Sequence, residues 1–486
     1  MKSISFKREK TLEGYLTLFL ALSMTVILSL CLTLIEGARK NGARFMTEYA
    51  MDIGMSSILA EYHRELLKQY DLFFIDTSYG SPLPSIGKTA EHLQTYMEGN
   101  FSSGEVGMGI YGQDLFGLSV QNIQIGNLAV ATDRQGKVLR AQAISYMTDK
   151  YGLSLFSEVE QWEKVVEEYE LQSESLSAQR NDVESQITSV DGSQIQISEE
   201  EWVTITVDNP ADEINTQRNK GVLLLVMKDT DSLSNAGFSL DNAASVRTLY
   251  QGQGPIKERS KAESLLELLL FDEYLLEKCS YYGQELEKSP MKYQIEYLLV
   301  GKDNDLDNLK SIALRLLAIR EAANAGYLFS SGGKRAMITA LATAVSVISL
   351  VPWLQPLLEY SILFAWSFAE SVYDVRTLFD GGKVPLVKND QNWHTDISVL
   401  FGGLDGDNGQ SGTGLSYADY LRVFLKLAGT DTKTMRFADM AELDIRKTEG
   451  NENFRMDGCI DGMTIEANII SRYADAFLIQ RDCCYE

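Results

Sequence analysis

The chain contains few of the residues on which disulfide scaffolds and metal sites depend. Its 486 residues include five cysteines, three histidines and eight prolines. No two cysteines have the C-x-x-C spacing, and the histidines lie far apart in sequence, so no zinc-binding pattern is present. The sequence also lacks G-x-S-x-G, H-E-x-x-H and P-loop motifs. We therefore expect no cofactor and no metal ion, and we predict that the protein is not an enzyme.

Basic residues are too few to balance the acidic ones, and they are unevenly distributed. The formal net charge is −24, yet residues 1–44 contain seven Lys and Arg against three Glu. Residues 45–486 therefore carry a net charge of −28. A body this acidic repels nucleic acid and anionic lipid, so we expect no nucleic-acid partner. The proportions of hydrophobic and charged residues are those of a globular protein, and the length favours two or three packed regions.

One long segment lacks charge altogether. Residues 14–35, between Glu13 and Glu36, form an apolar run of 22 residues without proline. A helix of this length is about 33 Å long, enough to cross a hydrocarbon core of about 30 Å. No small-x-small cleavage site follows it, and it exceeds the apolar region of a typical signal peptide. We predict a transmembrane anchor at 14–35 after a short basic leader at 1–13, with the lipid bilayer as its partner.

The flanking charges and the size of the body decide the expected orientation. Four basic residues precede the span, and Arg39, Lys40 and Arg44 follow it, which favours a cytoplasmic N-terminus only slightly. The large acidic body lacks the nucleotide and metal motifs of many cytosolic proteins, which favours the outside. We predict a single-pass protein of the cell membrane with a cytoplasmic N-terminus and an extracytoplasmic body.

Helical periodicity continues past the end of the span. Between residues 36 and 75 apolar residues recur at helical spacing: Ala38, Met46, Tyr49, Ala50, Ile53, Ile58, Tyr62, Leu66 and Tyr70. This pattern predicts an amphipathic helix that continues the anchor, either as one helix or as two abutting helices. Its apolar stripe would lie against the body.

Three stretches near the start follow one layout: KREKTLEG (7–14), YLTLFLAL (15–22) and MTEYAMDIGMSSILAEY (46–62). A basic leader meets a Gly, and an apolar helix with an amphipathic continuation follows. In this layout the chain resembles the TadE- and TadG-like pseudopilins of tight-adherence (Flp-type) pilus systems. The resemblance implies a processing site between Gly14 and Tyr15, and partners among other pilin-like subunits or assembly-platform proteins. Phe19 stands where processed pilins usually carry Glu, which implies a minor or assembly-associated subunit.

Three further stretches carry a second resemblance: AEYHRELLKQYDLFFIDTSYG (60–80), ESVYDVRTLFDGGKVPLVK (370–388) and GLSYADYLRVFL (414–425). Through them most of the chain resembles an uncharacterised family from Gram-positive bacteria. Members of that family carry one N-terminal helix and are thought to accompany such pilus systems. The resemblance implies no known chemistry.

The rest of the sequence predicts an α+β fold, in which a mostly helical body carries a small antiparallel sheet. Residues 76–190 would form the first part of the head and include a long charged helix. The polar segment 191–218 contains DGS and DNP turn signals and predicts a linker to the second part, 219–486. Strands at 118–132 and 295–301 would complete the sheet together with a C-terminal hairpin.

A second uncharged stretch, at 336–358, is long enough to span a membrane. It is rich in Ala, Ser and Thr, contains Pro352 and Pro356, and is followed directly by an amphipathic pattern. Two buried helices over 336–372, joined at VPWLQP, fit this composition better than a span does. A second crossing would instead return 359–486 to the cytoplasm.

Apolar residues alternate at 463–469 and 477–479, which predicts an antiparallel hairpin that turns near Tyr473. Such a turn would place Cys459 opposite a cysteine of the second strand. We predict a cross-strand disulfide in an oxidising compartment, formed by Cys459 and either of two partners, Cys483 or Cys484.

Two letter patterns match ligand-binding motifs, and each has a plainer interpretation. The glycines at 107–112 match a dinucleotide fingerprint, but no strand precedes them, so we expect a loop. Carboxylates alternate at 303–307 and 405–409 as in calcium loops, but Leu314 and Ser416 stand where such loops need Glu. We expect a helix N-cap at the first place, formed by Asp303 or Asp305, and a turn at the second.

Glu61, His63 and Glu65, near Asp71 and Asp76, place a histidine among carboxylates, which could make His63 a general base. Residues two apart on a helix point in different directions, however, and no nucleophile motif lies nearby. We expect a solvated helix face, or a contact between the helix and the head.

Two hypotheses for function follow. In the first, an anchored helix presents a head that joins, initiates or supports a surface pilus or its assembly platform, and apolar helices associate laterally in the membrane. The alternative is a membrane-anchored cell-surface enzyme or a cell-wall- or ligand-binding module. Neighbouring genes for a secretion ATPase and a prepilin peptidase would favour the first, and a deep cleft with facing carboxylates would favour the second.

Overall fold

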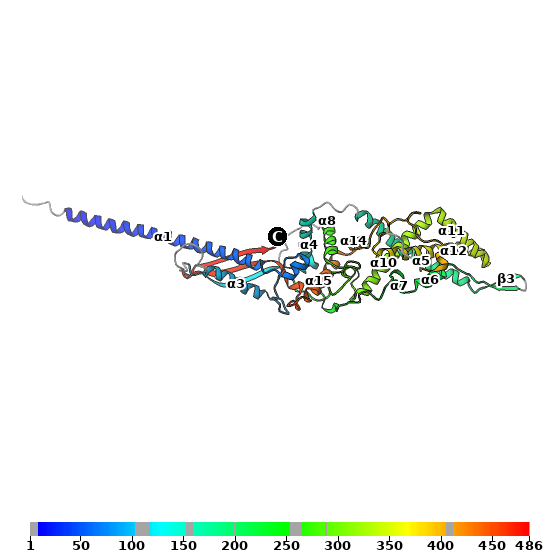
Figure 1. The fold of residues 1–486 in the computed structure, drawn as a ribbon. Coiled ribbons are helices and arrows are strands. Elements are labelled where there is room, and N and C mark those ends of the chain that lie inside the picture. Colours follow the sequence, from blue (N-terminus) through cyan, green and yellow to red (C-terminus); the bar gives the residue numbers. More distant parts are fainter. Residues whose placement is uncertain are drawn as a thin grey trace, which may run out of the picture.

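The computed structural model describes residues 8–102, 116–151, 159–198, 201–252, 265–286, 289–404 and 412–485. Figure 1 shows an elongated molecule in which α1 (Arg8–Leu59) projects from one end. A small sheet lies beside the second half of α1, and a helical body extends from there to the opposite end. The expected α+β fold, with a long N-terminal helix and a small antiparallel sheet, is confirmed.

Helix α1 is continuous over 52 residues and contains the predicted span. The amphipathic extension does not form one helix with it to the end, because α1 stops at Leu59 and α2 (Arg64–Tyr70) follows. His63 fixes the start of α2, since its Nδ1 accepts a hydrogen bond from the N–H of Leu66. The span and most of its amphipathic continuation therefore form one helix, and the last part of the predicted extension lies in the separate helix α2.

Strand β5 (Cys459–Ile470) is the centre of the sheet. It pairs antiparallel with three strands: β1 (Ile75–Asp76), β2 (Ser119–Val130) and β6 (Ala476–Cys484). The strand expected at 118–132 and the C-terminal hairpin are therefore confirmed. Alternation was a reliable guide here because Ile465 and Ile469, which point to the same face of β5, are both fully buried.

The strand expected at 295–301 is wrong, because these residues belong to helix α9 (Gln294–Val300). A short apolar run fits a buried strand and a buried helix equally well. The signal that separates them is Gly301, which ends α9 in the left-handed conformation with φ of 83°. Glycine at this position is typical of a helix C-terminus rather than of a strand end.

Helices make up most of the remaining chain. Their bounds are α3 (Ile86–Ser102), α4 (Asp133–Tyr151), α5 (Val159–Val190), α6 (Asp212–Arg218), α7 (Val222–Val226), α8 (Leu265–Lys278), α10 (Asp305–Ser330), α11 (Gly332–Ile348), α12 (Gln355–Phe379), α13 (Val399–Gly402), α14 (Tyr417–Leu427) and α15 (Thr430–Arg446). Short 3₁₀ turns lie at Leu240–Asn242, Pro352–Leu354 and Met456–Gly458.

The linker expected at 191–218 is a folded part of the body. It forms a two-stranded hairpin, β3 (Gln194–Ser198) with β4 (Glu201–Thr204), and then helix α6. Ile205 and Ile214 are buried among the side chains of the large helical core. The turn signals were real, but they mark the ends of short elements rather than an exposed connection.

The apolar stretch at 336–358 forms α11 and the turn that joins it to α12. Helix α12 is mostly buried, as predicted, whereas α11 buries only Ile338, Ala342 and Ser346. The expectation of two buried helices therefore holds for α12 and is wrong for α11. One face of α11 is open to solvent.

Two large hydrophobic cores and a small third cluster, of Met291, Tyr297 and Met440, stabilise the described part of the molecule. The proximal core joins the second half of α1 to α3 and one face of the sheet, and includes Met51, Ile58, Leu93, Ile465 and Ile469. The distal core is larger, and it joins α4, α5, α8, α10, α12, α14 and α15. The end that carries α1 and the rest of the body thus have separate apolar interiors.

Candidate functional site

The first half of α1 presents an uninterrupted apolar surface. Over residues 14–35 every large apolar side chain is exposed. The hydroxyl groups of Thr17, Ser23 and Thr33 donate hydrogen bonds to backbone carbonyl oxygens one turn earlier, so they are satisfied within the helix, as lipid requires. Within the described ranges α1 is the one helix long and apolar enough to cross a membrane. These features are compatible with a single-pass anchor.

Directly after the span, charged residues tie α1 to the turn of the β5–β6 hairpin. Arg39 Nη2 lies 2.7 Å from Asp475 Oδ2, and Lys40 Nζ lies 3.2 Å from Asp475 Oδ1. The Arg39 guanidinium also stacks on Tyr473, 3.9 Å from the ring centroid, and pairs with Glu36. The hydrogen bond from Arg39 lowers the pKa of Asp475 below its usual value. This contact attaches the head at the point where α1 leaves its apolar part.

The second half of α1 packs closely against α3 and the sheet. Met51 and Ile58 are fully buried in the proximal core. Gly54 allows the close approach to α3, because a Cβ at this position would lie 2.7 Å from Leu93 Cδ1. At the end of the helix, the Tyr485 hydroxyl donates to the carbonyl oxygen of Leu59 at 2.6 Å. The interface between the second half of α1 and the head is therefore rigid along its length.

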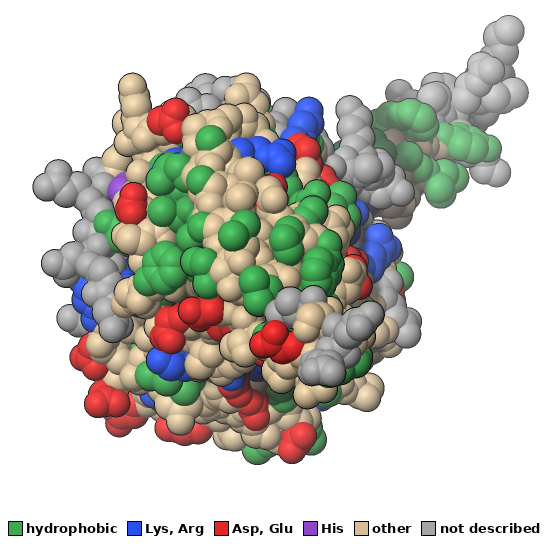
Figure 2. All heavy atoms as spheres, turned by 90° about the vertical axis from the view of Figure 1, so that its right-hand side faces the viewer, with side chains coloured by type: hydrophobic (Ala, Val, Ile, Leu, Met, Phe, Trp, Pro, Cys, Tyr) green, Lys and Arg blue, Asp and Glu red, His purple; other side chains and the backbone are tan. Residues whose placement is uncertain are grey.

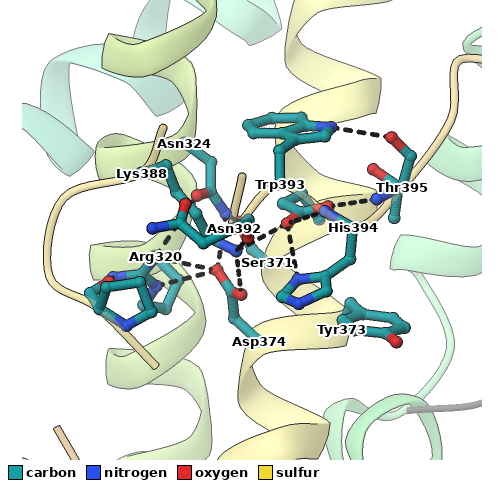
Figure 3. Close-up of polar contacts among 12 residues, drawn as sticks. Arg320, Asn324, Ser371, Tyr373, Asp374, Lys388, Asn392, Trp393, His394 and Thr395 are labelled. Carbon is teal, nitrogen blue, oxygen red and sulfur yellow. Dashed lines mark hydrogen bonds and ion pairs between the residues drawn. The ribbon is translucent and has the colours of Figure 1, made fainter. Parts of the chain in front are cut away.

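A buried cluster of charges lies at the remote end, between α10, α12 and the segment after α12 (Figure 3). Lys388 Nζ lies 2.6 Å from Glu370 Oε1 and 2.6 Å from Asp374 Oδ1. Arg320 and Asn324 both donate to Asp374 Oδ2 at 3.0 Å. The four charged side chains are fully buried and their charges cancel. We call these four residues the ionic cluster: Arg320, Glu370, Asp374 and Lys388.

Glu370 also receives backbone hydrogen bonds from the segment after α12. The N–H groups of His394 and Thr395 donate to its two oxygens at 3.0 and 2.8 Å. Burial raises the pKa of Glu370, but the hydrogen bonds from His394 and the charge of Lys388 outweigh it and hold the pKa at about 2. The ionised carboxylate thus fixes the segment at 388–395 against α12.

Glu370, Asp374 and His394 lie close enough together to suggest a metal site. The Lys388 ammonium, however, already lies between the two carboxylates at hydrogen-bonding distance from both. A divalent ion would have to displace this buried ammonium and would leave it unpaired, at a high cost in free energy. The residues do not fit a metal ion, so the ionic cluster is a structural feature that joins three segments.

A family model matches residues 200–471, which is more than half of the chain. Its description is that of a family of unknown function, DUF5702. The chain belongs to DUF5702. No curated protein and no solved structure matches the chain. In this DUF5702 protein the matched range includes the ionic cluster and the whole of the sheet's central strand, whereas α1 lies outside it.

Gly14 and Tyr15, the residues of the expected processing site, lie on the exposed surface of α1, inside a continuous helix. The described part of the DUF5702 chain shows no turn or strand at this place. Whether a peptidase cleaves there stays a prediction. Phe19 is exposed on the same helix, within the apolar surface.

The disulfide predicted for Cys459 is wrong in its register. In the β5–β6 hairpin Cys483 lies opposite Met463 and Cys484 lies opposite Gly462. Cys459 lies three residues further along β5, where it pairs with Asp76 of β1 instead. The hairpin turns over residues 471–475 as expected, but the second strand is too short to reach Cys459. All five cysteines have free thiols.

The carboxylates around His63 do not converge on it. His63 caps α2, and its Nε2 lies 2.9 Å from Asn451 Oδ1, so both ring nitrogens have structural roles. Glu61 instead contacts His92 Nδ1 at 3.0 Å and accepts hydrogen bonds from the hydroxyls of Tyr79 and Tyr96. The expected contact between the helix and the head is observed. The partner histidine, 31 residues away, could not be chosen from spacing.

At 303–307 the structure has a helix cap, as expected, but the capping residue is Asn304 and not the predicted Asp303 or Asp305. Asn304 is the N-cap of α10 and accepts a hydrogen bond from the N–H of Asp307. Asp305 accepts hydrogen bonds from the backbone of Lys292 and Tyr293 and from the Ser234 hydroxyl, so its carboxylate has a structural role. The glycines at 107–112 and the turn at 405–409 lie outside the described residues.

Proposed function

We propose that this protein is a membrane-anchored, extracytoplasmic structural or assembly component, similar to a minor pseudopilin of a tight-adherence-type pilus or secretion system. One observation carries the proposal. A single helix, α1, has a fully exposed apolar first half and a second half that is locked onto an antiparallel sheet. The same rigid element therefore serves the membrane and the head.

The apolar half of α1 needs an apolar environment, which water does not provide. Burial of one Leu or Ile side chain is worth roughly 1.5–3 kcal/mol, and residues 14–35 expose fourteen large apolar side chains. Insertion into a bilayer covers all of them at once and leaves the paired Glu36 and Arg39 at its surface. Lateral packing against apolar helices of other subunits then needs no further exposed surface on the head.

The orientation is part of the proposal. A net charge of −28 on residues 45–486 suits a body that stays soluble outside the membrane. The ionic cluster and the five free thiols require no particular redox state, so the fold is compatible with an oxidising or a reducing compartment.

Membrane fractionation tests the anchor. The full-length protein should remain in the membrane pellet after carbonate extraction, and Ile27→Arg should move most of it to the supernatant, because a charge at the centre of a span is costly. Leu171→Arg is the matched control, since Leu171 is also a largely exposed aliphatic residue but lies on α5. An unchanged distribution for Ile27→Arg would remove the anchor from the proposal.

Protease shaving of intact cells that carry a C-terminal tag tests the orientation, because a protected tag contradicts an extracytoplasmic body. The assembly role is tested by a photo-crosslinking residue at Leu30, on the exposed surface of the span. We expect an adduct with another single-span protein that has a pilin-like N-terminus. Crosslinks to lipid alone would leave the anchor but exclude lateral assembly through α1.

A further inference from the structure

The end of the molecule opposite α1 exposes a group of large apolar side chains. They come from α11, the turn after it and the start of α12: Met337, Val347, Ile348, Leu350, Trp353 and Tyr360. Ile348 is 78% exposed and Trp353 is 60% exposed. Figure 2 views the molecule from this end and shows hydrophobic side chains gathered over the middle of the face. We call these six residues the distal patch. Contiguous apolar surface of this kind marks a site of interaction.

Leu350, a residue of the distal patch, adopts a backbone conformation that leucine disfavours. The N–H of Val351 donates to the carbonyl of Ser346, and the N–H of Leu350 donates to the carbonyl of Val347, which is the hydrogen-bond pattern of a Schellman C-cap. Leu350 occupies the left-handed position of this motif, with φ of 60°, where glycine is usual. Its side chain is half exposed and contributes little to the core. A leucine that strains the backbone and faces solvent indicates a contact outside the chain.

The bilayer that holds α1 does not cover the distal patch. This step relies on the proposed function, because it takes α1 as the membrane span. Helix α1 is continuous through the junction and locked to the head, and the patch lies at the opposite end of the molecule (Figure 1). Figure 2 shows acidic side chains along one border of the hydrophobic group and basic ones along another, so this face has no uniformly basic surface that would attract anionic lipid.

A second copy of the chain is an equally poor occupant. Copies anchored in one membrane lie side by side, with their remote ends pointing the same way, so two end-facing patches do not meet. The start of α6 and the loop before it would also repel the same region of a second copy, because the carboxylates of Asp208 and Asp212 lie near Asp191. Asn209, which lies between Asp208 and Asp212 in sequence, donates to Ser361 Oγ at 3.0 Å. Ser361 follows Tyr360 of the patch on α12, so the two carboxylates lie next to this part of α12.

We propose that the distal patch is a docking surface for a partner protein whose contact surface is apolar and surrounded by Lys or Arg. The apolar centre matches the six exposed side chains, and the basic surround matches the carboxylates of Asp208 and Asp212. The partner lies further from the membrane than the head does. Pairing of an apolar centre with complementary charges around it is the usual composition of a specific protein interface.

The test uses the full-length protein in nanodiscs and two synthetic amphipathic helical peptides. Both peptides have a leucine face, and the residues bordering that face are lysines in one and glutamates in the other. The tip variant is Leu350→Gly combined with Trp353→Ser, and Leu350→Gly relieves the strained backbone, so the fold is preserved. The matched control is Leu83→Ser, which removes another exposed leucine from the loop before α3. Fluorescence anisotropy of labelled peptide gives the affinity.

We expect the lysine peptide to bind the native protein and the Leu83→Ser variant about tenfold more tightly than it binds the tip variant. The glutamate peptide should bind the native protein more weakly than the lysine peptide does. Equal affinity for the native protein and the tip variant overturns the proposal. The proposal is also overturned if the nanodiscs sediment with phosphatidylcholine–phosphatidylglycerol vesicles and this sedimentation depends on Trp353, because lipid is then the occupant. Concentration-dependent dimers that the tip variant loses make a second copy the occupant. Failure of the protein to enter nanodiscs contradicts the proposed anchor instead.

Discussion

The proximal and distal cores are stabilised by different means. The proximal core consists of aliphatic side chains from α1, α3 and the sheet, whereas the distal core contains the ionic cluster and a second buried pair, Lys433 with Asp272. Apolar burial has no direction and tolerates repacking, while a buried charge requires its partner at a fixed distance. The proximal core thus depends on buried area, and the distal core depends also on the geometry of specific pairs.

The largest expected effect is the loss of a charge from the ionic cluster. Lys388→Met leaves Glu370 and Asp374 buried without their shared ammonium, and we expect unfolding free energy to fall by about 3–5 kcal/mol. Urea unfolding measures it. Lys228→Met is the matched control, because Lys228 forms an exposed pair with Asp380 and should cost less than about 1 kcal/mol. Similar losses in both variants would contradict the distinction between the two cores.

In the proximal core the same assay should report a cavity rather than an unpaired charge. Ile465→Ala removes a fully buried aliphatic side chain of β5, and we expect a loss of about 2–4 kcal/mol. Because the two cores are separate, this loss should add to that of Lys388→Met within about 0.5 kcal/mol in the double variant. A coupling energy well above that value would show that the cores act as one.

A smaller effect, with the opposite sign, is expected at Glu296 in α9. Burial raises the pKa of this carboxyl to about 7. A group whose folded pKa is raised contributes most below its unfolded pKa of about 4.5, and that contribution is lost as the pH rises through about 7. Glu296→Gln should therefore be more stable than the native protein at about pH 8, by on the order of 1–3 kcal/mol.

Urea unfolding between about pH 5 and about pH 8 checks this difference, which should shrink toward the acidic end. Glu370 provides the contrast, because its lowered pKa stabilises the fold above about pH 4.5, and that contribution is lost as the pH falls toward about 2. A constant difference between Glu296→Gln and the native protein across the range would contradict a raised pKa.

The smallest effect is expected where α1 joins the head. Asp475→Asn weakens the ion pairs with Arg39 and Lys40, which lie at the surface, so the thermal midpoint in nanodiscs should fall slightly. The difference from the native protein should decrease as salt is added, because exposed ion pairs are screened. A salt-independent difference would mean that Asp475 acts through packing against Tyr473 instead.

Local sequence patterns predicted the first half of α1 and the sheet well. The uncharged run at 14–35 predicted the first half of α1, and alternation predicted β2, β5 and β6, because each signal lies within a few consecutive residues. The register of the hairpin was not fixed by alternation to better than a few residues, and the disulfide of Cys459 failed for that reason.

The remote end could not be predicted in the same way. Arg320 and Asp374 are 54 residues apart, and Lys388 lies on a segment without regular structure, so no spacing rule connects them. The stretch from Glu370 to Lys388 carried the second family resemblance, which was the available sign that it mattered. The open face of α11 was also missed, since a run without charge indicates burial or lipid contact but does not say which face of a helix is covered.

The unbroken course of α1 has a mechanical consequence. A hinge between membrane and head would let each move without the other, but here the junction has no loop to absorb a bend, and Arg39, Gly54 and Tyr485 fasten the helix along its length. If the first half of α1 is held in a bilayer, as proposed, a small tilt of that half moves the whole molecule with it, and the displacement is largest at the end opposite α1.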